Sequence, residues 1–166
     1  MIVANNIIML FFLFILHIIL FFFITHCTLH YYTITLHYST HHHWDHTGGN
    51  LELKKDGVKI YGPSENIPGC DVPLNGGDVI DFGNKQATII DVGGHTKGHI
   101  AYHFPTEHTV FVGDSLFALG CGKMFEGTPS QFWASLKRLR ELPDETIGTF
   151  LSFVFCLLVS FHFLAI

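Results

Sequence analysis

Formal charge is missing from both ends of this 166-residue sequence. The 9 Lys and Arg residues and the 14 Asp and Glu residues all lie between Asp45 and Glu145. This absence divides the chain into three unlike parts. We expect an apolar N-terminal segment, a folded domain and an apolar C-terminal tail, with approximate bounds 1–39, 40–147 and 148–166.

The apolar ends predict contact with a membrane. Ile7–Ile24 is an apolar run interrupted only by His17, and it meets the length of a transmembrane helix. Residues 148–166 are nearly as apolar and form a second candidate span. A signal peptide would need a basic start and a small-residue cleavage site, and neither is present. We therefore expect helical flanks and a membrane-associated protein.

A second explanation of the same ends is that they are translated non-coding sequence, joined to true coding sequence by a faulty gene model. Phe-rich, charge-free sequence that stops sharply at the edges of a domain fits this explanation. Part of the N-terminal segment nevertheless has a strand pattern, because residues 34–39 alternate apolar and polar residues just before His41. The sequence leaves both explanations open.

Basic clusters and paired cysteines are also scarce. The formal net charge is −5, and the cluster Lys137-Arg138-Arg140 fits a solvated face near the end of a helix. Nucleic acid is therefore not an expected partner. The four cysteines lie far apart without a Cys-x-x-Cys pair, which argues against a disulfide framework and against a zinc ribbon.

The most informative feature present is the run His-His-His-Trp-Asp-His from His41 to His46. In an extended or tightly looped segment, side chains two apart point the same way. His41 and His43 can then converge on one metal ion while Asp45 and His46 face a second. Imidazole and carboxylate suit zinc, iron or manganese. The alternative is a disordered His-rich tract that binds metal loosely, and further ligand-type residues downstream disfavour it.

Two downstream residues extend this ligand set. Paired glycines precede His95 and let the backbone turn so that its imidazole faces inward, which predicts a third ligand for the first metal. A phosphate-binding loop is the alternative, but the sequence lacks the glycine spacing of nucleotide-binding loops. Asp114 follows an apolar strand, where its two oxygens are able to bridge two ions, although Asp at such a position is also a common turn residue.

The middle of the chain predicts an α/β layered domain. Five strands are expected, over residues 58–61, 79–82, 86–92, 100–104 and 110–112. The second and third form a hairpin around Gly83-Asn84, and the last two turn at Pro105. A turn is expected at Gly62-Pro63-Ser64.

The clearest predicted helix covers residues 128–142. Thr128 caps it, Pro129 occupies its first turn and Gln131 completes a capping box. Pro143 stops it.

The chain resembles the metallo-β-lactamase superfamily, and within it glyoxalase II, the hydroxyacylglutathione hydrolases. The resemblance covers about residues 40–147 and is carried by the stretches 40–50, 94–99, 112–117 and 121–128. The first three are of a kind shared widely in the superfamily, whereas Cys-Gly-Lys-Met-Phe-Glu-Gly at 121–127 is typical of glyoxalase II. The resemblance as a whole implies a partial metallo-β-lactamase αββα sandwich.

The resemblance also implies a ligand set and a reaction. Two divalent metal ions would be bound, with zinc expected first and iron or manganese as the alternatives. One ion would have the ligands His41, His43 and His95. The other would have Asp45 and His46, and Asp114 would bridge the two ions. Asp45 is also the expected catalytic residue, while Lys123 and Phe125 would contact the glutathione moiety of the substrate. The reaction would be attack of metal-bound hydroxide on S-lactoylglutathione, or another S-2-hydroxyacylglutathione, to give D-lactate and glutathione. We expect a monomer, cytoplasmic or mitochondrial unless the apolar ends are genuine.

The chain departs from glyoxalase II after the predicted helix. The family has a further histidine there, in a Cys-Gly-His-Glu-Tyr-like segment, whereas this chain reads Thr-Ile-Gly-Thr-Phe at 146–150. The alternative function is therefore a truncated, catalytically impaired metal-binding remnant, membrane-tethered or produced by a faulty gene model. A persulfide dioxygenase using one iron is a third option, disfavoured by the stretch at 121–127.

Overall fold

Two β-sheets form the centre of the fold in the computed structural model, which describes residues 35–64, 66–150 and 164–165. The smaller sheet is parallel and has the order β1-β2-β3. Its strands are β1 (Leu36–Tyr38), β2 (Lys59–Pro63) and β3 (Val72–Leu74). The presence of β1 confirms the strand pattern just before His41.

The larger sheet has the order β11-β10-β7-β6-β5-β4. Neighbours from β4 to β7 are antiparallel, β10 joins β7 in parallel, and β11 joins β10 antiparallel. The strands are β4 (Val79–Phe82), β5 (Lys85–Asp91), β6 (Ile100–Phe104), β7 (Thr109–Phe111), β10 (Ile147–Thr149) and β11 (Leu164–Ala165). A separate short ribbon pairs β8 (Leu116–Phe117) with β9 (Gly120–Cys121).

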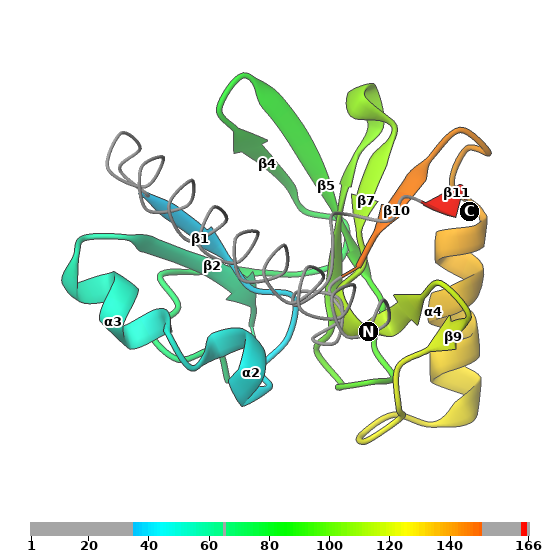
Figure 1. Cartoon of the computed structure of the whole chain (residues 1–166), viewed down its shortest axis with the longest axis horizontal. Coiled ribbons are helices and arrows are strands. Elements are labelled where there is room, and N and C mark those ends of the chain that lie inside the picture. Colours follow the sequence, from blue (N-terminus) through cyan, green and yellow to red (C-terminus); the bar gives the residue numbers. More distant parts are fainter. Residues whose placement is uncertain (1–34, 65, 151–163, 166) are drawn as a thin grey trace, which may run out of the picture. The chain divides into compact units, whose positions relative to one another are not determined.

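Helices cover the outer faces of the two sheets (Figure 1). The small sheet carries α3 (Asn50–Lys55) and the large sheet carries α4 (Pro129–Arg140), while the one-turn helix α2 (Trp44–Thr47) lies between β1 and α3 in the chain. Two 3-10 turns, η1 (Pro105–Glu107) and η2 (Gly113–Ser115), flank β7. These layers confirm the predicted α/β layered domain and form the αββα sandwich that the resemblance implied.

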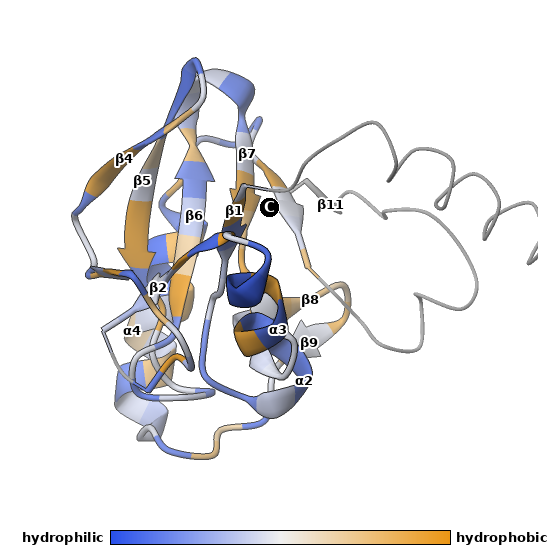
Figure 2. Ribbon diagram, turned by 90° about the vertical axis from the view of Figure 1, so that its left-hand side faces the viewer, coloured by the Kyte–Doolittle hydropathy of each residue, from blue (hydrophilic) through white to orange (hydrophobic). Residues whose placement is uncertain are grey.

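Three groups of buried apolar side chains fill the spaces between these layers. Side chains of β3, β5 and β6 pack together with those of β1 and β2, so this group lies between the sheets. Leu139 of α4 packs on the outer face of the large sheet, and Leu53 of α3 packs beside β2. Alternation along β6 serves two groups, since Tyr102 faces the small sheet while Ala101 faces α4. Apolar residues accordingly concentrate along the strands (Figure 2).

The strand and helix predictions for the middle of the chain are largely confirmed. Both predicted strand pairs form, and the helix begins with the predicted capping box between Thr128 and Gln131. It ends at Arg140, two residues early. The predicted turn at 62–64 is wrong, because Gly62 and Pro63 continue β2 and pair with β3.

The predicted boundary after residue 147 falls inside β10, which runs to Thr149. Phe150 then packs against the apolar group beneath α4. Within the residues that the structure describes, no helix is long and apolar enough to cross a membrane. The predicted span at 7–24, and residues 151–163 of the predicted tail, lie outside the described residues.

Candidate metal centre

The histidine-rich run connects the small sheet to α2. β1 leads directly into it, and the Thr40 carbonyl accepts a hydrogen bond from the Ile100 amide at 2.9 Å, so the run starts from a position fixed to the large sheet as well. His43 precedes α2, and its carbonyl accepts bonds from the His46 and Thr47 amides at 3.0 and 3.1 Å. A helical turn therefore fixes Asp45 and His46, whereas the sequence predicted an extended or looped segment.

His95 comes from the turn after β5, as predicted. Gly94 has φ +151°, a backbone conformation that side chains rarely adopt, and a Cβ there would lie 2.4 Å from the Phe132 ring. The His95 ring is buried, with Nδ1 2.7 Å from the Lys123 carbonyl oxygen and Nε2 2.9 Å from Nδ1 of His43. The Lys123 carbonyl thus orients the ring so that Nε2 faces the histidine-rich run.

Asp114 lies in η2, just beyond β7. Its Oδ1 is 3.4 Å from Nε2 of His46, and its Oδ2 is 3.6 Å from Nε2 of His95. Each carboxylate oxygen therefore faces a different histidine. This arrangement is the one that a bridging carboxylate between two metal ions requires.

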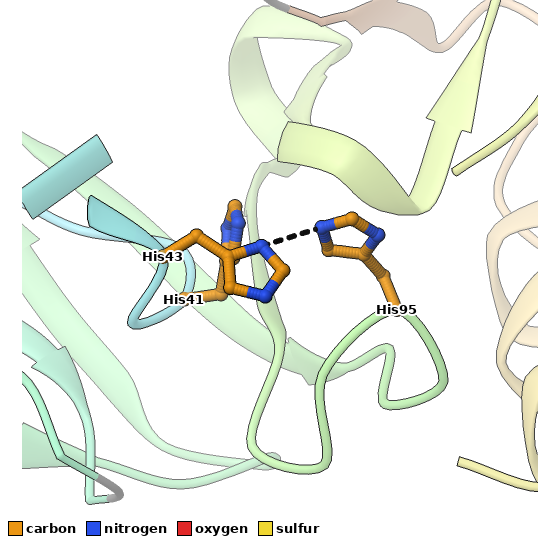
Figure 3. Close-up of side chains that lie close together, drawn as sticks. All are labelled: His41, His43 and His95. Atoms are coloured by element: carbon orange, nitrogen blue, oxygen red, sulfur yellow. Dashed lines mark hydrogen bonds between the residues drawn. The ribbon is translucent and has the colours of Figure 1, made fainter. Parts of the chain in front are cut away.

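Within the described part of the chain, two groups of three side chains each have donor atoms that all lie within 4.8 Å of one another. The first contains the three histidines drawn in Figure 3, and the second joins one of them to the other side of the site: His41, His43 and His95; His41, His46 and Asp114. Asp45 belongs to neither group, but its Oδ2 lies 3.6 Å from Nε2 of His46. The structure thus gathers all six predicted ligands in one place.

Burial and charge prepare His41, His43 and Asp114 to donate lone pairs, whereas the Asp114 carboxylate favours the protonated form of His46. Burial lowers the pKa of His41, and the neighbouring histidines lower it further, so its imidazole is neutral. Burial also lowers the pKa of His43. Burial opposes ionisation of Asp114, yet its hydrogen bond with His46 and the nearby histidines outweigh this effect, and its pKa is lowered. The same bond is the main cause of the raised pKa of His46.

One buried nitrogen tests whether a metal ion fits this site. Thr40 Oγ1 lies 3.1 Å from Nδ1 of His41, while Nε2 of His41 is buried and has no hydrogen-bond partner among the residues that the structure describes. An unpartnered buried nitrogen on a neutral imidazole is costly unless it binds something. Metal ligation requires this neutral form, so the donor set fits a divalent cation.

His99 packs directly against the candidate ligands His41 and Asp114. Its ring is fully buried and stacks on His41 with centroids 4.6 Å apart. Its Nε2 accepts a hydrogen bond from the Asp114 amide at 3.2 Å. Burial lowers the pKa of His99 to about 3, so the ring is neutral and able to accept.

The two predicted substrate contacts lie at the rim. Phe125 is 55% exposed, and its ring plane is nearly perpendicular to those of His43 and His95, with centroids 5.2 and 5.3 Å away. The Lys123 ammonium lies 4.7 Å from the centre of the Phe125 ring. Sequence reasoning missed the role of the Lys123 backbone, because a carbonyl contact leaves no trace in residue type.

The segment expected to carry a further histidine forms β10 beside β7. The Val112 amide donates to the Thr149 carbonyl at 3.0 Å, so β10 ends at the same edge of the sheet as Asp114. Between Thr146 and Phe150 no side chain is an imidazole, thiol or carboxylate. This part of the chain therefore adds no metal ligand.

Comparisons with known proteins agree with this geometry. The family model described as the metallo-beta-lactamase superfamily matches residues 54–149. The chain belongs to the metallo-beta-lactamase superfamily. A hydroxyacylglutathione hydrolase of Hyphomonas neptunium is 52% identical over 119 residues, covering 69% of this chain and 46% of that protein. One of Erythrobacter litoralis is 51% identical over 119 residues, covering 70% and 47%.

This chain therefore spans about half the length of the curated relatives it matches. Among solved structures of this superfamily fold, TTHA1623 in a di-iron-bound form superimposes with a TM-score of 0.60 at 28% sequence identity. That match covers 72% of this chain and 69% of the other.

Proposed function

We propose that this chain is the metal-binding domain of a glyoxalase II-type thioester hydrolase. Its substrate would be S-lactoylglutathione or another S-2-hydroxyacylglutathione, and its products D-lactate, or the corresponding hydroxy acid, and glutathione. The observation that carries the proposal is Asp114, whose two oxygens face His95 on one side and His46 on the other. Relatives about half identical to this chain are named for hydrolysis of such thioesters, which supports the same substrate class.

In this proposal the six gathered side chains hold two divalent ions. One ion has the ligands His41, His43 and His95, the other has Asp45 and His46, and Asp114 is shared. The chemistry that bound ions supply at such a site is activation of a water molecule and polarisation of the thioester carbonyl. Zinc is our first choice because imidazole-rich sites suit it, and the di-iron form of TTHA1623 makes iron the main competitor.

The remaining side chains bind and orient the substrate. The exposed Phe125 ring offers an apolar surface beside His43 and His95, and the Lys123 ammonium offers a positive charge to the carboxylates of glutathione. The leaving group is a thiolate with an ordinary pKa of about 8.5, so it departs without a dedicated general acid. Asp45 is 56% exposed and faces His46, which places its carboxylate where a water proton can be accepted.

The test is hydrolysis of S-lactoylglutathione by the purified full chain after loading with zinc, iron(II) or manganese(II). We expect thioester cleavage that collapses when His43→Ala removes a predicted ligand. The control is His108→Ala, which should leave cleavage unchanged, because His108 is exposed and lies at the end of η1, before β7. Cleavage that survives His43→Ala would contradict the proposal.

A second candidate function is metal binding without turnover. The observation that favours it is the lack of a ligand-type side chain between Thr146 and Phe150, which leaves the second ion with fewer protein ligands than the first. Stoichiometric metal uptake with no thioester cleavage under any of the three metals would select this candidate.

A further inference from the structure

Glu126 joins the two loops that carry the first histidine group. Its Oε1 lies 3.2 Å from Nε2 of His42, the residue between His41 and His43. Its Oε2 accepts a hydrogen bond from the Lys97 amide at 2.9 Å, two residues beyond His95. One carboxylate thus contacts both loops without touching a predicted ligand.

The segment that carries Glu126 is already fixed to the His95 loop. The Phe125 amide donates to the His95 carbonyl and the Gly127 amide donates to the Gly94 carbonyl, both at 3.2 Å. A Cβ on Gly127 would lie 2.6 Å from the Gly94 Cα, so the two backbones approach too closely for a side chain there. The Glu126 carboxylate therefore extends a fixed unit toward His42.

A connection away from the ligands is needed because of how the two loops meet. His43 Nδ1 and His95 Nε2 lie 2.9 Å apart, and these are the nitrogens that face each other within the first histidine group (Figure 3). A ring nitrogen that binds a cation is no longer free to bond another imidazole. The contact between His42 and Glu126 uses neither nitrogen, so it persists whether or not the group binds a metal ion.

We propose that Glu126 is a positioning residue that, together with His42, sets the spacing of the two loops and thereby the metal affinity of the first histidine group. This inference rests on the proposed function, since it takes His41, His43 and His95 as ligands. It also gives a role to His42, which contacts Glu126 and belongs to neither candidate ligand group.

The test is a double-mutant cycle on zinc affinity, measured on the full chain by competition with a chromophoric chelator. Residues that contact a metal ligand directly typically change metal affinity by about 10- to 100-fold. Because Glu126 acts one residue removed from the ligands, we expect Glu126→Ala to weaken zinc binding by no more than the lower end of that range, about 10-fold. His42→Ala should weaken it less, because the Lys97 contact survives. The double variant should bind no more weakly than Glu126→Ala, since both changes remove one shared contact.

Glu126→Gln is the conservative variant that separates positioning from general damage. Its amide oxygen can accept from the Lys97 amide while its amide nitrogen donates to His42, so it should restore most of the affinity. The matched control is the exposed pair of His108 and Glu145, 3.7 Å apart and remote from the site along β7. Alanine at either of these positions should leave zinc affinity unchanged, and circular dichroism should show every variant folded.

The outcomes separate this inference from the proposed function. A wild-type chain that takes up no zinc, iron or manganese would overturn the proposed function and this inference with it. A wild-type chain that binds zinc, with Glu126→Ala equal to it or with additive effects of the two alanines, would overturn the positioning role alone.

Discussion

At the scale of single residues, two glycines decide whether the ligands can meet. Gly94 lets His95 turn inward beside Phe132, and Gly113, with φ +53°, lies where a Cβ would be 2.6 Å from Thr40 Oγ1. Both are adjacent to a predicted ligand, His95 and Asp114. The close packing around the site therefore depends on the absence of a side chain at Gly94 and Gly113 as much as on the side chains that bind.

Gly94→Ala should consequently disrupt the site. The added methyl group would meet the Phe132 ring and hold an unfavourable backbone angle, so we expect a loss of about 2–4 kcal/mol in the free energy of unfolding. Urea unfolding of the metal-free chain measures this loss. Gly49→Ala is the control, because its Cβ would have no atom within 4 Å, and equal stability of the two variants would refute the argument.

At the scale of elements, the sequence predicted what local patterns encode. The hairpin of β4 and β5 follows from alternation around a Gly-Asn turn, and α4 follows from its cap and its prolines. The strand character of Gly62-Pro63 was missed, because those residues favour turns unless a neighbouring strand such as β3 pairs with them. Contacts between distant loops, such as that of Glu126 with His42, have no local pattern at all.

A buried histidine in strand β6 should make the free energy of unfolding depend on pH. All five of its residues are buried, and burial lowers the pKa of His103. Its cross-strand neighbours Thr88 and Val110 carry no titratable group. The unfolded chain therefore binds a proton at His103 more readily than the folded chain does. The stability that neutral His103 contributes is present above the ordinary histidine pKa of about 6.5 and is lost as the pH falls below that value.

We therefore expect His103→Gln to flatten the fall in stability on acidification. Each proton bound only by the unfolded chain lowers the free energy of unfolding by at most about 1.4 kcal/mol per pH unit. Urea unfolding of the metal-free chains at about pH 7.5 and about pH 5.5 brackets the ordinary histidine pKa. His108→Gln serves as the exposed control, and identical pH profiles of wild type and His103→Gln would be the contrary result.

At the scale of the whole molecule, the metal centre joins the two sheets. His41 to His46 follow β1 of the small sheet, while His95 and Asp114 follow β5 and β7 of the large one. A cation held by side chains from both sheets favours the state in which they are packed together, since the unfolded chain does not bring these ligands together.

Metal binding should accordingly stabilise the whole described domain. A ligand that binds only the folded state at about 1,000 times its dissociation constant adds about 4 kcal/mol. We expect zinc to raise the thermal midpoint of the chelator-treated chain by several degrees, and His43→Ala to abolish the increase. A midpoint that zinc does not change in wild type would show that the ligands do not bind across the two sheets.

The order of these ligands along the chain has a consequence for synthesis. The residues from His41 to His46 leave the ribosome well before Asp114, which completes the set only after β7 has been made. Before His95 has been made the early imidazoles lack their third histidine, and before Asp114 has been made they lack the bridging carboxylate, so a metal ion captured by them alone would be held by an incomplete site. Stable metal uptake therefore has to wait until the large sheet has formed. Metal binding is accordingly a late step in the maturation of the chain.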